Sequence, residues 1–177
     1  MLSVFFALLT SAQSDDDRCD FARVDGRTLD ERKFREEYVE KGRPVVLTNL
    51  VDHWPAFARW TPQYISDNFG NETLRSDHIH FGVLKRIRRL SRGVFDDLTV
   101  QQMIDDEKPI LYFIKPHHQL SQKIRSDMAV PDTLKSIQGF GPSFSFGGPG
   151  AWIDFHKHGR SWLAMVSGRK LFVVSPG

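Results

Sequence analysis

Short apolar runs, separated by glycine and proline, constrain the fold of this chain more than any other feature. The 177 residues include 14 Phe, 13 Gly and 9 Pro. Aromatic and β-branched residues favour strands, whereas Gly and Pro interrupt regular structure and mark turns. The runs gather late, from Phe144 to Val174, and helical patterns come earlier. We therefore expect a mostly β domain with peripheral helices, an α+β arrangement rather than a helical bundle.

The earlier part of the chain contains start signals for three helices. Thr28 with Glu31 and Thr99 with Gln102 have the spacing of a capping box. Thr61 precedes a proline, the arrangement of an N-cap followed by proline at the first helical position. Gly42 and Gly70 follow the patterns that start at Thr28 and Thr61 and are expected to end those helices. The predicted elements are helices over 28–41, 61–69 and 99–106, and strands over 44–50, 110–114 and 171–174.

Charge and cysteine content exclude several classes of function. The 24 basic and 22 acidic residues leave a net charge of +2, so the chain lacks the global basic field of nucleic-acid-binding proteins. The only cysteine, Cys19, excludes an internal disulfide and a CxxC zinc site. One basic cluster, residues 85–92, is interpreted as a solvated loop or strand end, with an anionic partner as the alternative. We predict no nucleic-acid partner.

The first 14 residues have the pattern of a secretory signal peptide. A short apolar run is followed by small residues, and cleavage after Ala12 or Ser14 fits this pattern. The run is shorter than the ~20 apolar residues of a membrane span, so none is predicted. A buried N-terminal strand or helix is the alternative. Asn71-Glu-Thr73 is a glycosylation sequon. We expect a domain over residues 15–177, in the endoplasmic reticulum lumen or secreted.

Two histidines near the end of the chain are candidate metal ligands. If residues 151–158 are a strand, His156 and His158 lie on one face, ~6.6 Å apart along the strand, with Asp154 on the same face. Neutral imidazole is a common ligand of transition metals, so the pair forms half of a mononuclear site. A complete site needs another protein ligand. Two histidines at an exposed strand end are the alternative interpretation.

The surroundings of these histidines resemble a known family. Five residues separate Gly150 from His156, and one residue separates His156 from His158, a spacing that resembles the first cupin motif. Further segments with a family pattern are residues 144–150, 155–159 and 168–176, together with 41–47, Trp54, Trp60, 69–70 and 111–113. Through these segments the chain resembles the JmjC domain of the cupin-8-like family, most closely the luminal JmjC-domain-containing protein 8 group.

The resemblance implies a double-stranded β-helix, or jelly-roll, barrel that binds Fe(II) and 2-oxoglutarate. His156 matches the first iron ligand, and Lys170 matches the lysine that pairs with the far carboxylate of 2-oxoglutarate. Ile153 stands where the family has a polar side chain before the first histidine, so we expect Tyr112 to supply a hydroxyl to the co-substrate instead. The remaining histidine ligand is expected beyond Gly177, so the barrel is expected to be incomplete at the C-terminus. An exposed strand lysine is the alternative for Lys170.

One departure from the family motif keeps three functions open. His158 stands where active members have a carboxylate, which removes a negative charge from the metal's ligands. The resemblance implies an Fe(II)- and 2-oxoglutarate-dependent oxygenase, a hydroxylase or demethylase acting on a protein. The alternatives are a catalytically inactive luminal binding protein with a protein partner, and a plain cupin that holds zinc or no metal. The other histidine pairs, His78 with His80 and His117 with His118, are interpreted as an exposed strand face and a loop.

Overall fold

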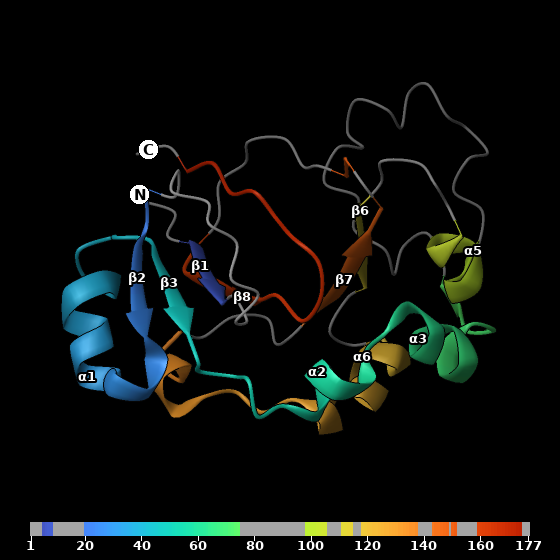
Figure 1. Ribbon diagram of the computed structural model, residues 1–177, viewed down its shortest axis with the longest axis horizontal. Coiled ribbons are helices and arrows are strands. Elements are labelled where there is room, and N and C mark those ends of the chain that lie inside the picture. Colours follow the sequence, from blue (N-terminus) through green and yellow to red (C-terminus); the bar gives the residue numbers. More distant parts are fainter. Residues whose placement is uncertain are drawn as a thin grey trace. The chain divides into compact units, whose positions relative to one another are not determined.

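The computed structural model describes eight segments of the chain (Figure 1). They are residues 5–8, 20–74, 98–105, 111–114, 118–137, 143–148, 150–151 and 159–174. The chain divides into two compact units, and each is described by itself. Unit 1 contains Met1–Ala58, Asp127–Gly139 and Lys157–Gly177, and unit 2 contains Arg59–Ser126 and Phe140–His156.

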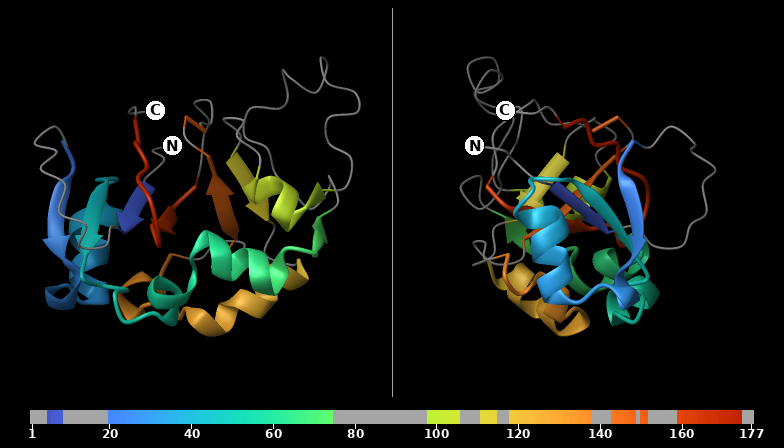
Figure 2. Two further views of the ribbon diagram at one scale, coloured as in Figure 1. Left: turned by 45° about the vertical axis from the view of Figure 1, so that its right-hand side comes forward. Right: turned by 90° about the vertical axis from the view of Figure 1, so that its left-hand side faces the viewer.

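A four-stranded parallel sheet is the centre of unit 1. Its strand order is β2 (Ala22–Asp25), β3 (Val45–Thr48), β1 (Phe5–Leu8) and β8 (Ser161–Ala164). Figure 2 shows β2 and β3 side by side, and their register pairs Ala22 with Val45. Strand β3 is apolar and almost fully buried from Val45 to Leu47, which is typical of a parallel strand covered on both faces. The strand predicted over 44–50 is confirmed as β3.

The N-terminal run contributes the strand between β3 and β8. The backbone of β1 pairs in parallel with both neighbours, with Phe6 opposite Val45 on one side and opposite Trp162 on the other. Residues 5–8 thus form a strand of the sheet in the uncleaved chain. Cleavage of residues 1–14 stays a prediction.

The first helix begins at a different residue from the one predicted. Helix α1 (Glu31–Phe34) continues as a π-type turn, η2 (Arg35–Val39), and its N-cap is Asp30, whose side chain accepts a hydrogen bond from the Lys33 amide at 2.8 Å. The capping box at Thr28 was wrong, because Thr28 belongs to a preceding 3-10 turn, η1 (Gly26–Thr28). The predicted stop is confirmed at Gly42, which adopts a left-handed φ of 61°.

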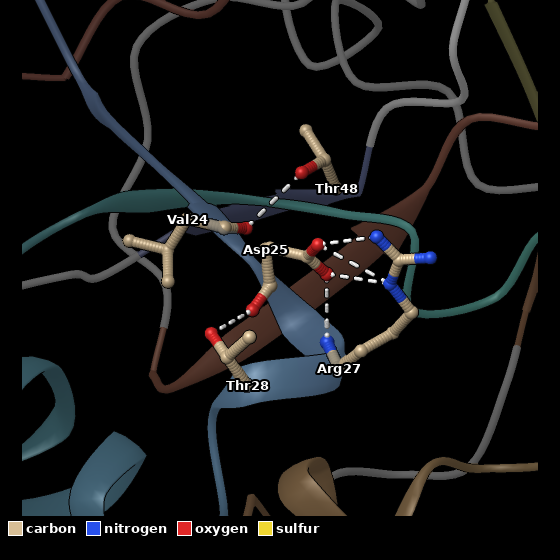
Figure 3. Close-up of polar contacts among 5 residues, drawn as sticks. All are labelled: Val24, Asp25, Arg27, Thr28 and Thr48. Carbon is tan, nitrogen blue, oxygen red and sulfur yellow. Dashed lines mark hydrogen bonds and ion pairs between the residues drawn. The ribbon is translucent and has the colours of Figure 1, made fainter.

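A charged corner holds η1 at the end of β2 (Figure 3). The Asp25 carboxylate accepts hydrogen bonds from the Arg27 amide at 3.0 Å and from the Arg27 guanidinium at 2.5 Å. These bonds hold the pKa of the Asp25 carboxyl well below its usual range. The Thr28 hydroxyl donates to the Asp25 carbonyl at 2.8 Å, and the Thr48 hydroxyl donates to the Val24 carbonyl at 3.3 Å. The corner therefore explains why Thr28 is unavailable as a helix cap.

The core of unit 1 joins the first helix to a later segment. Phe34 is fully buried, and α1 contacts η4 (Asp132–Leu134), whose Leu134 is also fully buried. The Thr133 hydroxyl donates to the Leu29 carbonyl at 3.0 Å across 104 residues of sequence. Figure 1 shows α1 beside β2 and β3. These long-range contacts hold the helix against η4.

Unit 2 contains short helices and two antiparallel strand pairs. Helices α3 (Pro62–Phe69) and α5 (Val100–Ile104) contact each other. Strand β4 (Thr73–Leu74) pairs with β5 (Leu98–Thr99), and β6 (Leu111–Ile114) pairs with β7 (Phe144–Gly147). Helix α6 (Gln119–Lys123) leads into η3 (Ile124–Asp127), and α2 (Pro55–Arg59) connects the units in sequence.

Both predicted caps in unit 2 are confirmed. The Tyr64 amide donates to the Thr61 hydroxyl at 3.0 Å. The Gln102 amide donates to the Thr99 hydroxyl at 3.1 Å, and the Thr99 amide donates to the Gln102 side chain at 2.8 Å, which completes the capping box. Helix α5 ends at Ile104, earlier than predicted, and β6 confirms the predicted strand over residues 111–114.

The described residues thus combine β-sheets with peripheral helices, in agreement with the α+β expectation. The jelly-roll barrel itself remains a prediction. Within the described segments, we find no helix that is both long and apolar enough for a membrane span.

Candidate functional site

The predicted metal ligands lie outside the described residues. His156, His158 and Asp154 fall within residues 152–158, and the structure describes the chain on either side. Among the described residues, no group of three or more His, Cys, Asp and Glu side chains is arranged to hold a metal ion. His78, His80, His117 and Cys19 also lie outside the described segments. The metal site therefore stays a prediction.

Residues 152–158, which contain both histidines, follow a strand and a turn in the sequence and precede another strand. Strand β7 precedes them, and the Ala151 amide donates to the Gly148 carbonyl at 3.1 Å across a turn in which Gly150 has a φ of 77°. Strand β8 follows them from Ser161. β7 belongs to unit 2 and β8 to unit 1.

Lys170 is a partly buried cation. Its ammonium lies 5.3 Å from the centre of the Phe172 ring, and burial lowers the pKa of the ammonium. A cation over an aromatic face is stabilised by the electron-rich ring, but it still loses hydration. Lys170 is therefore partly buried rather than freely exposed, and its role in binding 2-oxoglutarate stays a prediction.

The strand predicted over residues 171–174 does not form. The segment has no regular structure, and Leu171 and Val173 are 87% and 65% exposed, although Phe172 and Val174 between them are partly buried. The alternation is that of a strand, but no described strand pairs with it. A strand needs a hydrogen-bonded neighbour. The apolar sequence of residues 171–174 was therefore not sufficient to make them a strand.

Tyr112 lies in the interior of unit 2. It is 2% exposed in β6, and its ring lies 5.5 Å from the ring of Phe146, the residue opposite it in β7. A buried tyrosine hydroxyl usually finds a hydrogen-bond partner. Tyr112 and Lys170 belong to different units.

Asn71 lies on the surface, and its glycosylation stays a prediction. It is exposed in the turn between α3 and β4, and Thr73 is exposed as well. A surface turn is the usual context of an N-glycosylation acceptor.

The structure also places polar groups that sequence reasoning missed. His118 is buried, and its Nδ1 accepts a hydrogen bond from the Leu120 amide at 3.1 Å, which caps α6. Trp54 is 3% exposed, with its ring 6.4 Å from that of Trp162, and its indole nitrogen has no hydrogen-bond partner within the described part of the chain. Ser161 and Ser136 also bury hydroxyls without such a partner. No sequence pattern marks these groups, because burial depends on remote contacts.

Comparison with known protein families assigns the chain to one of them. The model of the cupin-like domain matches residues 31–139, from the start of α1 to the segment after η4. This chain belongs to the cupin-like domain family. Tyr112 and Asn71 lie within the matched range of the cupin-like domain, and His156, His158 and Lys170 lie after it.

Three curated relatives of this cupin-like protein are named as demethylases. It is 25% identical over 151 residues to lysine-specific demethylase 8 of Xenopus tropicalis, covering 80% of this chain and 33% of the relative. It is 25% identical over 111 residues to the bifunctional arginine demethylase and lysyl-hydroxylase psr-1 of Caenorhabditis elegans, covering 62% and 26%. It is 26% identical over 195 aligned positions to arginine-specific demethylase JMJ20 of Arabidopsis thaliana, covering 87% and 41%.

The cupin-like chain therefore spans between about a quarter and two fifths of the length of these relatives. The resemblance to cupin-like JmjC proteins is confirmed.

Proposed function

We propose that this chain is a JmjC-type oxygenase that uses Fe(II) and 2-oxoglutarate to modify a protein side chain. The observation that carries the proposal is the match to three relatives that are all named as lysine or arginine demethylases, one of them also as a hydroxylase. Both activities act on protein side chains. The family match over residues 31–139 supports the same fold for this chain.

The donor groups of the chain suit this cofactor pair. His156 and His158 would supply two neutral imidazole ligands, which are common for iron and zinc. When bound, iron would allow O2 to oxidise a C–H bond to C–OH while 2-oxoglutarate is converted to succinate and CO2. Tyr112 would donate a hydrogen bond to the co-substrate.

Lys170 would bind the far carboxylate of 2-oxoglutarate. Its ammonium is partly buried, and burial lowers its pKa, so a carboxylate partner would stabilise the charged form. Loss of a hydrogen bond to a charged group costs ~1.5–3 kcal/mol. We expect Lys170→Ala to weaken 2-oxoglutarate binding by that amount.

A second candidate is a luminal binding protein that keeps the fold without turnover, or a cupin that holds zinc. His158 favours it, because an imidazole replaces the carboxylate that the family motif places beside the first histidine. The site would then carry more positive charge than a facial triad of two histidines and a carboxylate. The apolar N-terminal run and the sequon at Asn71 support a location in the secretory pathway for either candidate.

The two candidates differ in the fate of 2-oxoglutarate. We would measure succinate formation by the full chain with Fe(II), with and without lysine- and arginine-containing peptides, alongside metal content. We expect His156→Ala to abolish both, and His53→Ala, which changes an exposed histidine, to leave both unchanged. Metal that depends on His156 without succinate would favour the binding protein. Equal metal content in the two variants would overturn the ligand assignment.

A further inference from the structure

Strand β1 belongs to the leader, residues 1–14, yet it fills an inner position of the sheet. Its backbone pairs with β3 on one side and with β8 on the other, so that Ala7 lies opposite both Val46 and Leu163. Without the leader, the inner edges of β3 and β8 would lack their ladder partner. Because Val46 is only 2% exposed, backbone groups at this position have little access to water, and leaving them without hydrogen bonds is costly.

A contact between two tryptophans joins β8 to the chain that follows β3. Trp54 comes shortly after the end of β3, and its ring lies 6.4 Å from the ring of Trp162 in β8. Trp54 is buried. The contact involves no residue of the leader, so we expect it to keep β3 and β8 on either side of one strand position when the leader is absent.

Residues 171–174 have the side chains of an inner strand, although they form no strand in this structure. They read Leu-Phe-Val-Val, all residues that are apolar and three of them β-branched or aromatic. Figure 1 draws them as part of a red trace after β8. Leu171 and Val173 are 87% and 65% exposed, so they lack the stabilisation that burial gives. A strand that is covered on both faces needs apolar side chains in this continuous pattern.

The turn before this segment fixes the register with which it can return to β8. Residues 167 and 168 form a bend in which Gly168 has a left-handed φ of 85°, and Ser-Gly is a common turn pair. If these two residues are the loop of a hairpin, residue 166 faces residue 169 and Leu163 faces Phe172. Leu163 also faces Ala7 in the structure, so Phe172 would occupy the place of Ala7.

We propose that residues 171–174 take the place of β1 between β3 and β8 in the chain without its leader. The exchange supplies both inner edges with a ladder partner and gives Leu171 and Val173 a place in the sheet. Lys170 directly precedes the new strand, so loss of the leader would also set the position of the residue proposed to bind 2-oxoglutarate. Only this last consequence rests on the proposed function.

The first experiment tests the exchange with an engineered disulfide. The full chain, produced without secretion, carries Cys19→Ser, Val46→Cys, Phe172→Cys and a protease site inserted after Ser14. Adjacent strands lie ~4.8 Å apart, within the ~4.4–6.8 Å that separates the Cα atoms of a disulfide. We expect oxidation to form the disulfide after the folded chain is cut and the released peptide is removed. The uncut chain should form little of it, because β1 lies beside Val46 there.

The matched control combines Val46→Cys with Val173→Cys, whose side chain would point to the opposite face of the sheet. It should form little disulfide after the cut. Combining Val46→Cys with Leu163→Cys detects direct pairing of β3 with β8, since one strand between them keeps them ~9.6 Å apart. A disulfide in that variant after the cut, or equal yields for positions 46 and 172 before and after it, would overturn the proposal.

Two variations test whether the leader and the new strand compete for the same position. Ala7→Pro in the uncut chain weakens the ladder of β1, and should allow the disulfide between positions 46 and 172 without any cut. A synthetic peptide of residues 1–14, added to the cut protein before oxidation, should lower the disulfide yield, whereas the same peptide with Ala7→Pro should not. A yield that neither peptide changes would show that the leader does not occupy this position.

The second experiment needs no cysteine and measures stability through Val173→Pro. Val173 lies in no strand of the uncut chain, so the substitution should leave the urea midpoint of the uncut protein unchanged. In the cut protein it removes a ladder donor from an inner strand, and we expect a lower midpoint. Equal midpoints for the cut protein with and without Val173→Pro would contradict the exchange, as would a cut protein that shows no cooperative urea transition.

Discussion

At the scale of single residues, burial changes the chemistry of Lys170 in a way that the sequence does not show. A lysine between Arg169 and Leu171 would ordinarily be expected on the surface. The structure makes it partly buried beside Phe172, which lowers the pKa of its ammonium. The unfolded chain then binds more protons than the folded one just below the ordinary lysine pKa of ~10.4. Stability therefore increases as pH rises through that window, because burying a neutral amine costs less.

The same shift predicts how 2-oxoglutarate binding depends on pH. As pH rises through the lowered pKa of Lys170, the amine becomes neutral and loses its ion pair, so affinity should fall at a pH below the usual lysine range. In Lys170→Arg the guanidinium stays charged throughout, so affinity should not fall over that range. Calorimetric titration of both proteins with 2-oxoglutarate at a series of pH values measures this. Identical pH profiles would argue against a role of Lys170 in binding the carboxylate.

At the scale of elements, helix starts depend on which polar side chain is free to reach the first amides. Thr28 and Asp30 are both good N-cap residues by type. The Thr28 hydroxyl is bonded to the Asp25 carbonyl, whereas Asp30 is extended, with φ −77° and ψ 166°, and reaches the Lys33 amide. The Asp25–Arg27 corner therefore decides the position of the cap.

We predict that Asp30→Ala destabilises the folded protein by ~1 kcal/mol, the usual cost of losing a helix N-cap. Thr28→Ala should cost less, because it removes only one exposed hydrogen bond. Urea denaturation followed by circular dichroism measures both changes. A larger loss in Thr28→Ala than in Asp30→Ala would show that the helix starts at the earlier residue in solution.

At the scale of the whole molecule, residues far apart in sequence meet in one sheet. Strands β2, β3, β1 and β8 bring residues 5–8 between residues 45–48 and 161–164. A cleaved leader would remove β1 and leave β3 and β8 without their shared neighbour. The fate of the first 14 residues is thus a question about the sheet as well as about targeting.

We predict that Ala7→Pro, made in the full chain produced without secretion, lowers the urea midpoint. Proline cannot donate a ladder hydrogen bond in the middle of a sheet, and each lost bond costs a net ~0.5–1.5 kcal/mol. Gln13→Pro, placed after β1, is the control and should change the midpoint less. Equal midpoints for Ala7→Pro and the wild-type chain would show that β1 does not stabilise the fold.

The resemblance to the family was correctly inferred from short segments such as residues 41–47 and 168–176, and the match over residues 31–139 confirms it. The candidate site was less predictable. The exposure of Asn71 and the environments of Tyr112 and Lys170 became known only from the structure. The Trp54 indole nitrogen, which has no hydrogen-bond partner among the described residues, had no sequence signal, because burial results from contacts that local patterns do not encode.

The caps at Thr61 and Thr99 and the stop at Gly42 followed from sequence alone, because each depends on hydrogen bonds or dihedral angles within about four residues. Only the tertiary structure decided that residues 5–8 join a parallel sheet and that residues 171–174 form no strand. A strand exists only where a neighbour completes its hydrogen bonds, and that neighbour is supplied by a distant part of the chain.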